Sequence, residues 1–329
     1  MDLSIVLVNY RCWDDLERCL ESLAYLHATG QPETEVIVVD NDSADGRLDR
    51  FASRFPDVQW IRNAGNFGFA NGCNRGADAA TGEQLLFLNP DCTDPDQVLG
   101  RFWQECGDQP GIWTLRQVDQ DGRPTRVFDA FPTAWNLLGP VRAVLRLLFP
   151  ARYPDARRPD DGVREVDWVS GSALMISRRD FQHLGGWSDD FWMYSEDVDL
   201  CRRARRAALP VRYWPGLTIT HRHGGSSRSS PEVTALTKTE VVISKHLYAH
   251  RNLGFAAAGA FHGLLFVSRF LPRALTAAVA WLLPSGRLRI AADIGYRLAR
   301  YYGQVIRHRS WISPRSVRHP GRESENPEA

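Results

Sequence analysis

Apolar runs alternate with helix-like segments over the first sixty residues. Residues 4–8, 35–39 and 58–61 are short runs rich in apolar, β-branched side chains. Between them, residues 13–26 carry apolar side chains at helical spacing, and a second helical segment covers about 46–55. Apolar strands that alternate with helices predict a parallel sheet with helices on both faces. Ligands bind such sheets at the carboxyl ends of the strands, so the polar residues after each run are the candidates for chemistry.

Further strands and helices are expected up to about residue 307. Further strands are expected at 84–88, 167–177 (interrupted at Ser170–Ser172), 211–214 and 217–220, with a β-rich stretch at 112–127. Helices are expected after a Gly-rich loop within 66–80, at 95–104, at 179–184, from Glu196 to about 208, and over most of 231–307. Residues 131–162 show no clear period, and 137–149 is either an amphipathic helix or a mobile lid. We therefore expect a doubly wound α/β domain over residues 1–230, a helical region over 231–312, and disorder over 313–329.

Composition excludes several classes of protein. With 329 residues, 43% hydrophobic and 24% charged, the chain is not a mainly disordered, collagen-like or small disulfide-stapled protein. Its six cysteines form no CxxC pair and lie beside no histidine at metal-ligand spacing, which indicates a reduced, cytosolic protein. The first residues lack the basic and apolar regions of a signal peptide, so we expect them to form a strand.

Charge divides the chain into an acidic part and a basic part. Residues 1–200 carry 19 Lys and Arg against 33 Asp and Glu, whereas residues 201–329 carry 21 against 6. Two apolar stretches in the basic part, 253–268 and 274–284, are flanked by arginines. Such stretches fit helices that lie in a membrane surface with their cations at anionic headgroups. Core helices, a dimer interface and a transmembrane hairpin are the alternatives.

Acidic residues stand at the ends of three separate elements. Asp40 and Asp42 follow the second strand, Asp91 follows the fourth, and Glu196 and Asp197 begin a helix. Carboxylates that converge at one sheet edge can hold a divalent cation and leave one carboxylate as a general base. Each carboxylate alone could instead cap a helix or form a turn, which is the commoner role.

Two further motifs carry amides, glycines and histidines. Residues 66–76 combine closely spaced glycines with three amides at a helix start, which suits an anion or a hydroxyl-bearing ligand. Ordinary helix capping explains the same residues equally well. His221 and His223 face the same way on an extended chain, either as metal ligands or as a buried structural pair. The chain has no Gly-x-Ser-x-Gly elbow, so nucleophilic catalysis is a poor interpretation.

Seven motifs occur in the order seen in one enzyme family. They are Val8-Asn9-Tyr10, Val38 to Ser43, Asn66-x-Gly68-Phe69-Ala70-x-Gly72-x-Asn74-x-Gly76, Leu88-Asn89-Pro90-Asp91, Trp168 to Ser172, Gly185-Gly186-Trp187 and Tyr194 to Leu200. Together they resemble glycosyltransferase family 2, most closely its bacterial rhamnosyltransferase-like branch, over about residues 1–226. The resemblance implies a GT-A fold, a nucleotide-sugar donor, a divalent metal (Mg²⁺ or Mn²⁺) and inversion at the anomeric carbon.

The resemblance also implies roles for individual residues. The nucleotide sugar would contact Asn9, Asp40, Asp42, Asn66, Gly68, Asn71, Asn74 and Asn89. Asp91 matches the last carboxylate of the family's DxD metal motif, with His221 as the first choice for a second ligand and His223 as the next. Asp197 matches the catalytic base, and Glu196 matches its acidic neighbour. The acceptor would face Ser170, Gly171, Trp192 and Tyr194.

These roles define an expected function. The chain would transfer a sugar, with L-rhamnose from dTDP-rhamnose as the best guess, to a saccharide or polyprenyl-diphosphate-linked acceptor in cell-surface polysaccharide synthesis. Its basic, apolar tail would hold it on the cytoplasmic face of the cell membrane, and no nucleic acid partner is expected. A UDP-sugar such as UDP-galactofuranose is an alternative donor, since uracil and thymine present the same pairing edge. The alternatives of other classes are a nucleotide-sugar nucleotidyltransferase and a catalytically inert, membrane-bound partner.

Overall fold

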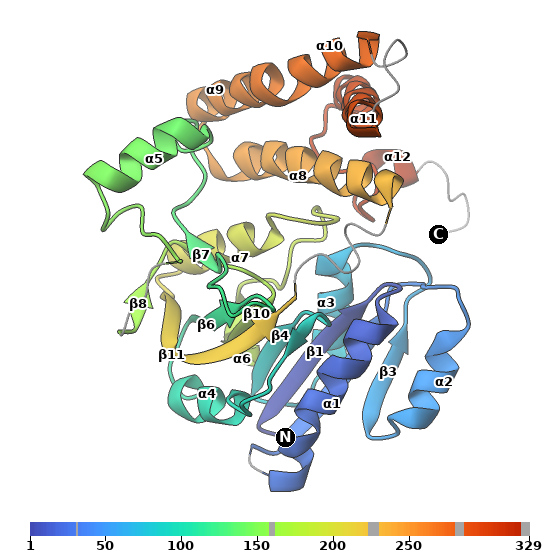
Figure 1. Cartoon of the computed structure of the whole chain (residues 1–329), viewed down its shortest axis with the longest axis vertical. Helices are drawn as coiled ribbons and strands as arrows, with labels where there is room; N and C mark the ends of the chain where they lie inside the picture. The colour runs from blue at the N-terminus through green and yellow to red at the C-terminus, as the bar shows by residue number, and fades with distance from the viewer. Residues whose placement is uncertain (31, 158–161, 223–229, 280–285, 324–329) are drawn as a thin grey trace.

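The computed structural model describes residues 1–30, 32–157, 162–222, 230–279 and 286–323. Within these residues, nine strands form one mixed sheet in the order β3-β2-β1-β4-β10-β6-β11-β5, with β8 paired to β11 (Figure 1). The strands are β1 (Leu3–Asn9), β2 (Thr34–Asp40), β3 (Val58–Arg62), β4 (Gln84–Leu88), β5 (Cys92–Thr93), β6 (Ile112–Val118), β8 (Arg164–Glu165), β10 (Ala173–Ser177) and β11 (Val211–His221). A two-stranded sheet pairs β7 (Phe128–Asp129) with β9 (Trp168–Val169).

The predicted parallel sheet is confirmed for its first four strands. β1 pairs in parallel with β2 and β4, and β2 pairs in parallel with β3. β10 then runs antiparallel to both β4 and β6, while β11 runs parallel to β6. The carboxyl ends of β1, β2 and β4 therefore meet at one edge, where Asn9 lies directly opposite Asp40.

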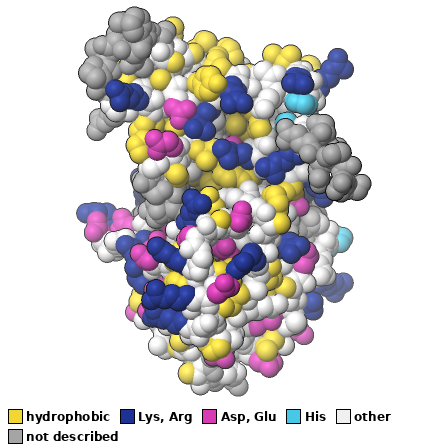
Figure 2. Space-filling view, turned by 90° about the vertical axis from the view of Figure 1, so that its right-hand side faces the viewer, with side chains coloured by type: hydrophobic (Ala, Val, Ile, Leu, Met, Phe, Trp, Pro, Cys, Tyr) yellow, Lys and Arg dark blue, Asp and Glu magenta, His cyan; other side chains and the backbone are white. Residues whose placement is uncertain are grey.

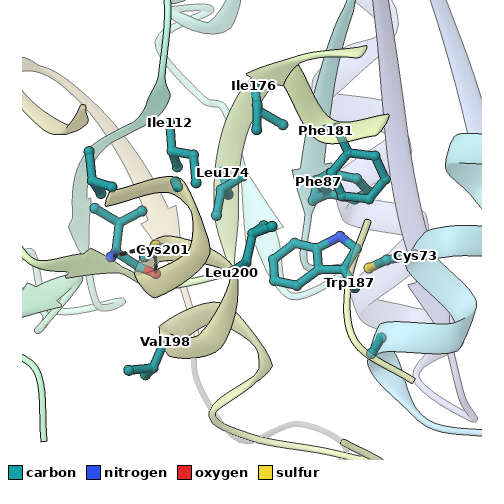
Figure 3. Packing of buried hydrophobic residues seen from close by; sticks show 14 of the residues in the cluster. Cys73, Phe87, Ile112, Leu174, Ile176, Phe181, Trp187, Val198, Leu200 and Cys201 are labelled. Carbon is teal, nitrogen blue, oxygen red and sulfur yellow. Dashed lines mark hydrogen bonds between the residues drawn. The ribbon is translucent and has the colours of Figure 1, made fainter. Parts of the chain in front are cut away.

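Both faces of this sheet are covered by helices, as the apolar strands require. Ile5 and Leu7 of β1 point to the face packed by α1 (Trp13–Thr29), α2 (Arg47–Arg54) and α4 (Leu99–Cys106). Val6 and Val8 point to the face packed by α3 (Phe69–Ala79), α6 (Arg178–His183) and α7 (Glu196–Arg206). On that second face, the Trp187 ring lies 5.1 Å from Phe87 and closes the core beside α3 (Figure 3).

A layer of helices lies over the carboxyl edge of the sheet (Figure 1). It contains α8 (Pro231–Asn252), α9 (Phe255–Leu265), the π-helical turn η1 (Phe266–Phe270), α10 (Leu271–Val279) and α11 (Gly286–His308). α5 (Gly139–Leu148) lies beside this layer, so residues 137–149 contain a helix. The stretch Phe255–Ala277 is continuous through η1 and is long and apolar enough to cross a membrane by length and composition. The apolar stretch was expected to end before Arg269, but the helix continues through that residue.

Three expectations about secondary structure were wrong. Residues 211–214 and 217–220 belong to one strand, β11, because a register shift between Trp214 and Thr218 accommodates Pro215 and Gly216. α4 begins at Leu99 and not at residue 95, because the Asp94 carboxylate accepts the amide hydrogens of Val98 and Leu99.

The third concerns residues 313–323, which were expected to be disordered. The Ser313 hydroxyl donates to Glu240 on α8, and the Ser316 hydroxyl donates to the Asp189 carbonyl. α12 (Pro320–Glu323) follows, and residues 324–329 lie outside the described part of the chain. The C-terminal segment 311–323 therefore joins the helical layer to the α/β domain.

Candidate active site

A cavity of about 970 Å³ lies between the carboxyl edge of the sheet and the helical layer. Its floor includes Asn89, Pro90 and Asp91 after β4, and one wall includes Glu196 and Asp197 at the start of α7. α8 contributes the roof. The cavity thus collects polar residues from the strand ends, where the alternation of strands and helices predicted them.

Asp197 is held as a hydrogen-bond acceptor at the N-terminus of α7. Its Oδ1 accepts the Val198 amide hydrogen at 2.8 Å, and its Oδ2 accepts that of Gly171 at 3.2 Å. Burial raises the pKa of Asp197 to about 6, although these two hydrogen bonds oppose the shift. At neutral pH the carboxylate is therefore ionised, with a pKa close enough to 7 to accept a proton readily.

Glu196 differs from its neighbour in being fully enclosed. Burial, together with the charge of Asp197, raises the pKa of Glu196 well above its usual range. Its Oε2 is buried and has no hydrogen-bond partner among the described residues. Within the pair, the negative charge is therefore more favourable on Asp197 than on Glu196.

The backbone before α7 is strained. Tyr194 and Ser195 have φ values of 72° and 63°, a left-handed conformation that side chains other than glycine rarely adopt. This turn directs Tyr194 toward the cavity and starts α7 at Glu196. Two consecutive strained residues next to a buried acid pair are typical of a functional site.

Asp91 and His221 face each other across the end of β11. Asp91 Oδ1 lies 3.1 Å from His221 Nε2, and His221 Nδ1 lies 2.8 Å from the amide oxygen of Gln117. Gln117 thus holds the ring through Nδ1, and Nε2 is the nitrogen that faces Asp91. A carboxylate and an imidazole nitrogen at this separation suit a divalent cation held between them.

Cys92 is the third group of this cluster, since its Sγ and the ligand atoms of Asp91 and His221 lie within 4.8 Å of one another. Burial raises the pKa of the Cys92 thiol well above its usual range. Its Sγ lies 3.5 Å from the Ser172 carbonyl oxygen, to which the thiol donates. A protonated thiol is a poor ligand, so Asp91 and His221 form the donor set that fits Mg²⁺ or Mn²⁺.

The residues predicted to bind the nucleotide lie in different places. Asn66 and Asn89 line the cavity. Asn9 and Asp40 are buried beneath it, where the Asn9 amide donates to Asp40 Oδ1 at 2.8 Å. Asp42 is exposed and does not line the cavity.

The Gly-rich loop packs closely against the segment around Trp192. Gly68 has a φ of 95°, and a Cβ there would lie 2.0 Å from the Trp192 carbonyl oxygen. The Trp192 indole in turn donates to the Asn66 carbonyl at 3.1 Å. Asn71 and Asn74 hydrogen-bond to Asp189, and Asn74 also bonds the Trp187 backbone, so neither amide reaches the cavity.

The predicted acceptor residues do lie together. Ser170, Gly171, Trp192 and Tyr194 all line the cavity. Ser170 and Gly171 adjoin the base, because the Gly171 amide donates to Asp197. His223 lies outside the described residues.

Three residues of the site were not predicted from the sequence: one supports the Asp91–His221 pair, and two line the cavity. Gln117 is buried and fixes His221, and its only sequence signal is a polar residue within an apolar strand. Lys245 on α8 and Arg315 in the C-terminal segment also line the cavity, and the Arg315 guanidinium lies 5.2 Å from the Trp192 ring centre. No local pattern marks these two residues, because only the tertiary fold brings them to the sheet edge.

Comparison with known proteins agrees with this geometry. The family model described as Glycosyl transferase family 2 matches residues 4–185. Rhamnosyltransferase WbbL of Escherichia coli K12 is 34% identical over 235 residues, covering 68% of this chain and 85% of that protein. An N-acetylglucosaminyl-diphospho-decaprenol L-rhamnosyltransferase of Mycobacterium tuberculosis is 27% identical over 251 residues, covering 70% of this chain and 78% of that protein.

Two solved structures share the fold. The mannosyltransferase PcManGT of Pyrobaculum calidifontis, in complex with GDP-Man and Mn²⁺, superposes with a TM-score of 0.52 at 17% identity, covering 92% of this chain and 81% of that one. GalNAc-T7 with UDP, GalNAc and Mn²⁺ superposes with a TM-score of 0.51 at 16% identity, covering 80% of this chain and 54% of that one. Because the family model covers more than half of the chain and WbbL is matched over most of its length, the chain belongs to glycosyltransferase family 2 and is a glycosyltransferase similar to the bacterial rhamnosyltransferases.

Proposed function

We propose that the chain is an inverting, metal-dependent transferase that moves L-rhamnose from dTDP-rhamnose to a saccharide carried on a polyprenyl diphosphate. The observation that carries this proposal is the arrangement of one cavity, with an ionised Asp197 on one wall and the Asp91–His221 pair on its floor. A base and a cation-binding pair in the same cavity are the two elements that a single displacement at a sugar carbon needs.

The reaction begins with a hydroxyl of the acceptor next to Asp197. As its oxygen bonds to the anomeric carbon, the proton passes to the Asp197 carboxylate, and the bond from that carbon to the diphosphate breaks with its electron pair. Attack from the face opposite the leaving group inverts the anomeric centre. The Gly171 and Val198 amide hydrogens hold the carboxylate in place.

Asp91 and His221 are the residues that would hold the metal. When bound, a divalent cation supplies Lewis-acid stabilisation to the departing nucleoside diphosphate. Gln117 supports this pair by fixing the His221 ring. Asn66 and Asn89 line the same cavity and would face the nucleotide sugar.

The choice of donor and acceptor follows the relatives. Two of them are rhamnosyltransferases, and one is named for an N-acetylglucosaminyl-diphospho-decaprenol acceptor. The decisive experiment incubates purified protein with Mn²⁺, a panel of nucleotide sugars and farnesyl-diphosphate-linked N-acetylglucosamine. Transfer from dTDP-rhamnose, seen as released dTDP and a heavier lipid product, supports the proposal. Transfer from a UDP-sugar alone would replace the donor, and no transfer with any donor would refute the proposed function.

The pH profile is set by Asp197. Because burial raises its pKa to about 6, protonation below that pH removes the base. We expect log kcat/KM to be level above pH 7 and to fall with a slope of about one per pH unit below about pH 6. A profile that stays level down to pH 4.5, with the protein still folded, would show that Asp197 is not the base.

We also propose that the enzyme docks on the cytoplasmic face of the cell membrane through its helical layer. Phe255, Val267 and Leu275 project from the α9–α10 stretch and are 98%, 58% and 71% exposed. Figure 2 shows hydrophobic side chains over this helical end of the molecule, with Lys and Arg side chains among them. An exposed apolar surface mixed with cations suits a bilayer with anionic headgroups.

Replacing Phe255 and Leu275 together by Asp is expected to weaken binding to phosphatidylglycerol vesicles by roughly tenfold or more. Each apolar side chain that becomes buried in the bilayer contributes about 1.5–3 kcal/mol to the free energy of binding. Co-sedimentation of the full chain measures this. Val163→Asp, an exposed apolar residue next to β8, is the matched control and should bind like the unaltered protein. Equal sedimentation of all three proteins would contradict membrane docking by this surface.

A further inference from the structure

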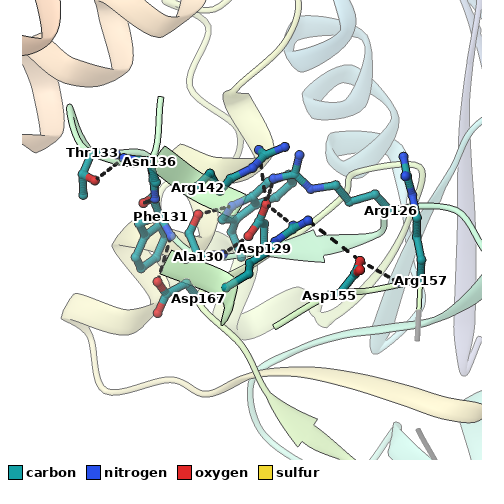
Figure 4. Close-up of polar contacts among 12 residues, drawn as sticks. Arg126, Asp129, Ala130, Phe131, Thr133, Asn136, Arg142, Asp155, Arg157 and Asp167 are labelled. Atoms are coloured by element: carbon teal, nitrogen blue, oxygen red, sulfur yellow. Dashed lines mark hydrogen bonds and ion pairs between the residues drawn. The ribbon is translucent and has the colours of Figure 1, made fainter. Parts of the chain in front are cut away.

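A second group of charges lines the cavity, away from Asp91 and His221. Arg126, Arg142 and Lys245 all line it, and each carries a positive charge. The buried Asp129 contacts Arg126 and lies 3.7 Å from Arg142 (Figure 4). Asp129 also contacts Arg146 on α5, at 3.3 Å, so three guanidinium groups share one carboxylate.

This cationic cluster, Arg126, Arg142 and Lys245, has more positive charge than its surroundings neutralise. Among the described residues, Lys245 has no carboxylate within ion-pair distance, and the charges that act on it are Arg269, Arg126 and Arg142. Burial and these like charges lower the pKa of Lys245 to about 8, and burial and neighbouring arginines lower that of Arg126 to about 10. The Arg126 Nε is buried and has no hydrogen-bond partner among the described residues. A half-buried cluster of like charges is unfavourable unless an anion completes it.

The cluster lies on the acceptor side of the cavity. Arg126 immediately precedes Val127, whose carbonyl accepts the Ser170 amide hydrogen at 2.8 Å. Gly171, the next residue, donates to Asp197. The cationic cluster is thus connected to the base through the Ser170–Gly171 segment and not through the Asp91–His221 pair.

On its other side the cluster meets an apolar surface. Arg142 belongs to α5, whose Leu147 and Leu148 are 80% and 62% exposed. Leu137, just before α5, lines the cavity and packs against a buried apolar cluster formed by Ala249, Phe261 and Leu265 of α8 and α9. The cationic cluster therefore adjoins α5 and α9, which lie side by side above the sheet (Figure 1).

We infer that Arg126, Arg142 and Lys245 bind the diphosphate of a lipid-linked acceptor, whose sugar reaches Asp197 and whose lipid chain leaves the cavity along α5 and α9. Asp197, the cationic cluster and the apolar side chains follow one another in the same order as the sugar hydroxyl, the diphosphate and the hydrocarbon chain of such a molecule. Guanidinium groups bind phosphate oxygens in pairs, and an ammonium adds a compact charge. This inference rests on the proposed function, because it takes the acceptor to be carried on a diphosphate.

The kinetic test compares two acceptors that share one sugar. Farnesyl-diphosphate-linked N-acetylglucosamine carries the diphosphate, and octyl N-acetylglucosaminide does not. Arg142→Gln and Lys245→Gln are each expected to raise KM for the first acceptor by about tenfold or more, as the loss of a charge-assisted hydrogen bond predicts. KM for the donor and the rate with the octyl glycoside should stay near those of the unaltered protein.

Arg146→Gln is the matched control. It removes the same charge from the same helix, but Arg146 pairs with Asp129 and Asp155 and does not line the cavity. Its KM values should resemble those of the unaltered protein. A rise in donor KM in Arg142→Gln and Lys245→Gln, or equal losses with both acceptors, would overturn the inference.

A binding measurement separates this inference from the proposed function. Calorimetric titration of the full chain with farnesyl diphosphate, in the presence of saturating dTDP and Mn²⁺, requires no turnover. We expect binding by the unaltered protein and by Arg146→Gln, and about tenfold weaker binding by Arg142→Gln and Lys245→Gln. Equal binding by all four proteins would overturn the inference even if sugar transfer is demonstrated. Weakened binding would support the cationic cluster even if no tested donor reacts.

Discussion

Replacing Asp197 by Asn is expected to lower kcat by roughly 10²- to 10⁴-fold, the range that general-base catalysis provides. Asparagine has nearly the same shape, but it has one oxygen and can accept only one of the Gly171 and Val198 amide hydrogens. It cannot take the proton from the acceptor hydroxyl. The measurement is product formation at saturating donor and acceptor.

Loss of folding would not explain this effect. Removing a buried charge with a raised pKa is favourable, and it offsets the loss of one backbone hydrogen bond, so Asp197→Asn should be about as stable as the unaltered protein at pH 7. Thermal unfolding and nucleotide binding verify this. Asp293→Asn makes the same chemical change in a half-buried ion pair on α11, outside the cavity, and should retain full activity. An Asp197→Asn protein with unaltered kcat would refute the assignment of the base.

Removing the metal is expected to have the second large effect. Chelation with EDTA should reduce transfer by roughly 10²- to 10³-fold, equivalent to about 3–4 kcal/mol, and added Mn²⁺ or Mg²⁺ should restore it. Asp91→Asn should lower the activity similarly at low metal concentration, because it removes the only charged ligand of the Asp91–His221 pair. Activity measured against metal concentration tests both statements.

Cys92→Ala is the matched control for the metal site. Cys92 lies within the same 4.8 Å cluster as Asp91 and His221, but its thiol stays protonated. Its replacement should leave the metal requirement unchanged. Activity that resists EDTA, together with an active Asp91→Asn, would show that this pair holds no catalytic metal.

The sheet was predictable because its signal is local. β1, β2 and β4 are apolar on both faces. Such a strand is visible in the sequence as a continuous run of apolar residues. The error over residues 313–323 has the opposite cause. Ser313 and Ser316 are polar, and their order depends on Glu240 and Asp189, which are distant in the chain.

The candidate site was predictable where its residues stand at the ends of strands and helices. Asp91, Glu196 and Asp197 stand at element ends, where a parallel sheet gathers ligands, and they do line the cavity. Asn74 carried an equally strong motif signal, yet its amide bonds the Trp187 backbone. Sequence spacing shows that a polar residue is near a loop but does not show which partner satisfies it. Lys245 lies in a region whose composition suggested membrane association, and Arg315 lies in a tail that was predicted to be disordered.

The C-terminal segment has a consequence for biosynthesis. Arg315 lines the cavity, and Ser313 and Ser316 fasten its segment to α8 and to the Asp189 loop. All nine strands of the sheet precede α8 in the chain, so the sheet can form while the roof of the cavity is still being translated. A nascent chain that has folded its sheet still lacks Lys245 and Arg315. The enzyme is therefore completed late in synthesis, after the helical layer that we propose to bind the membrane has emerged.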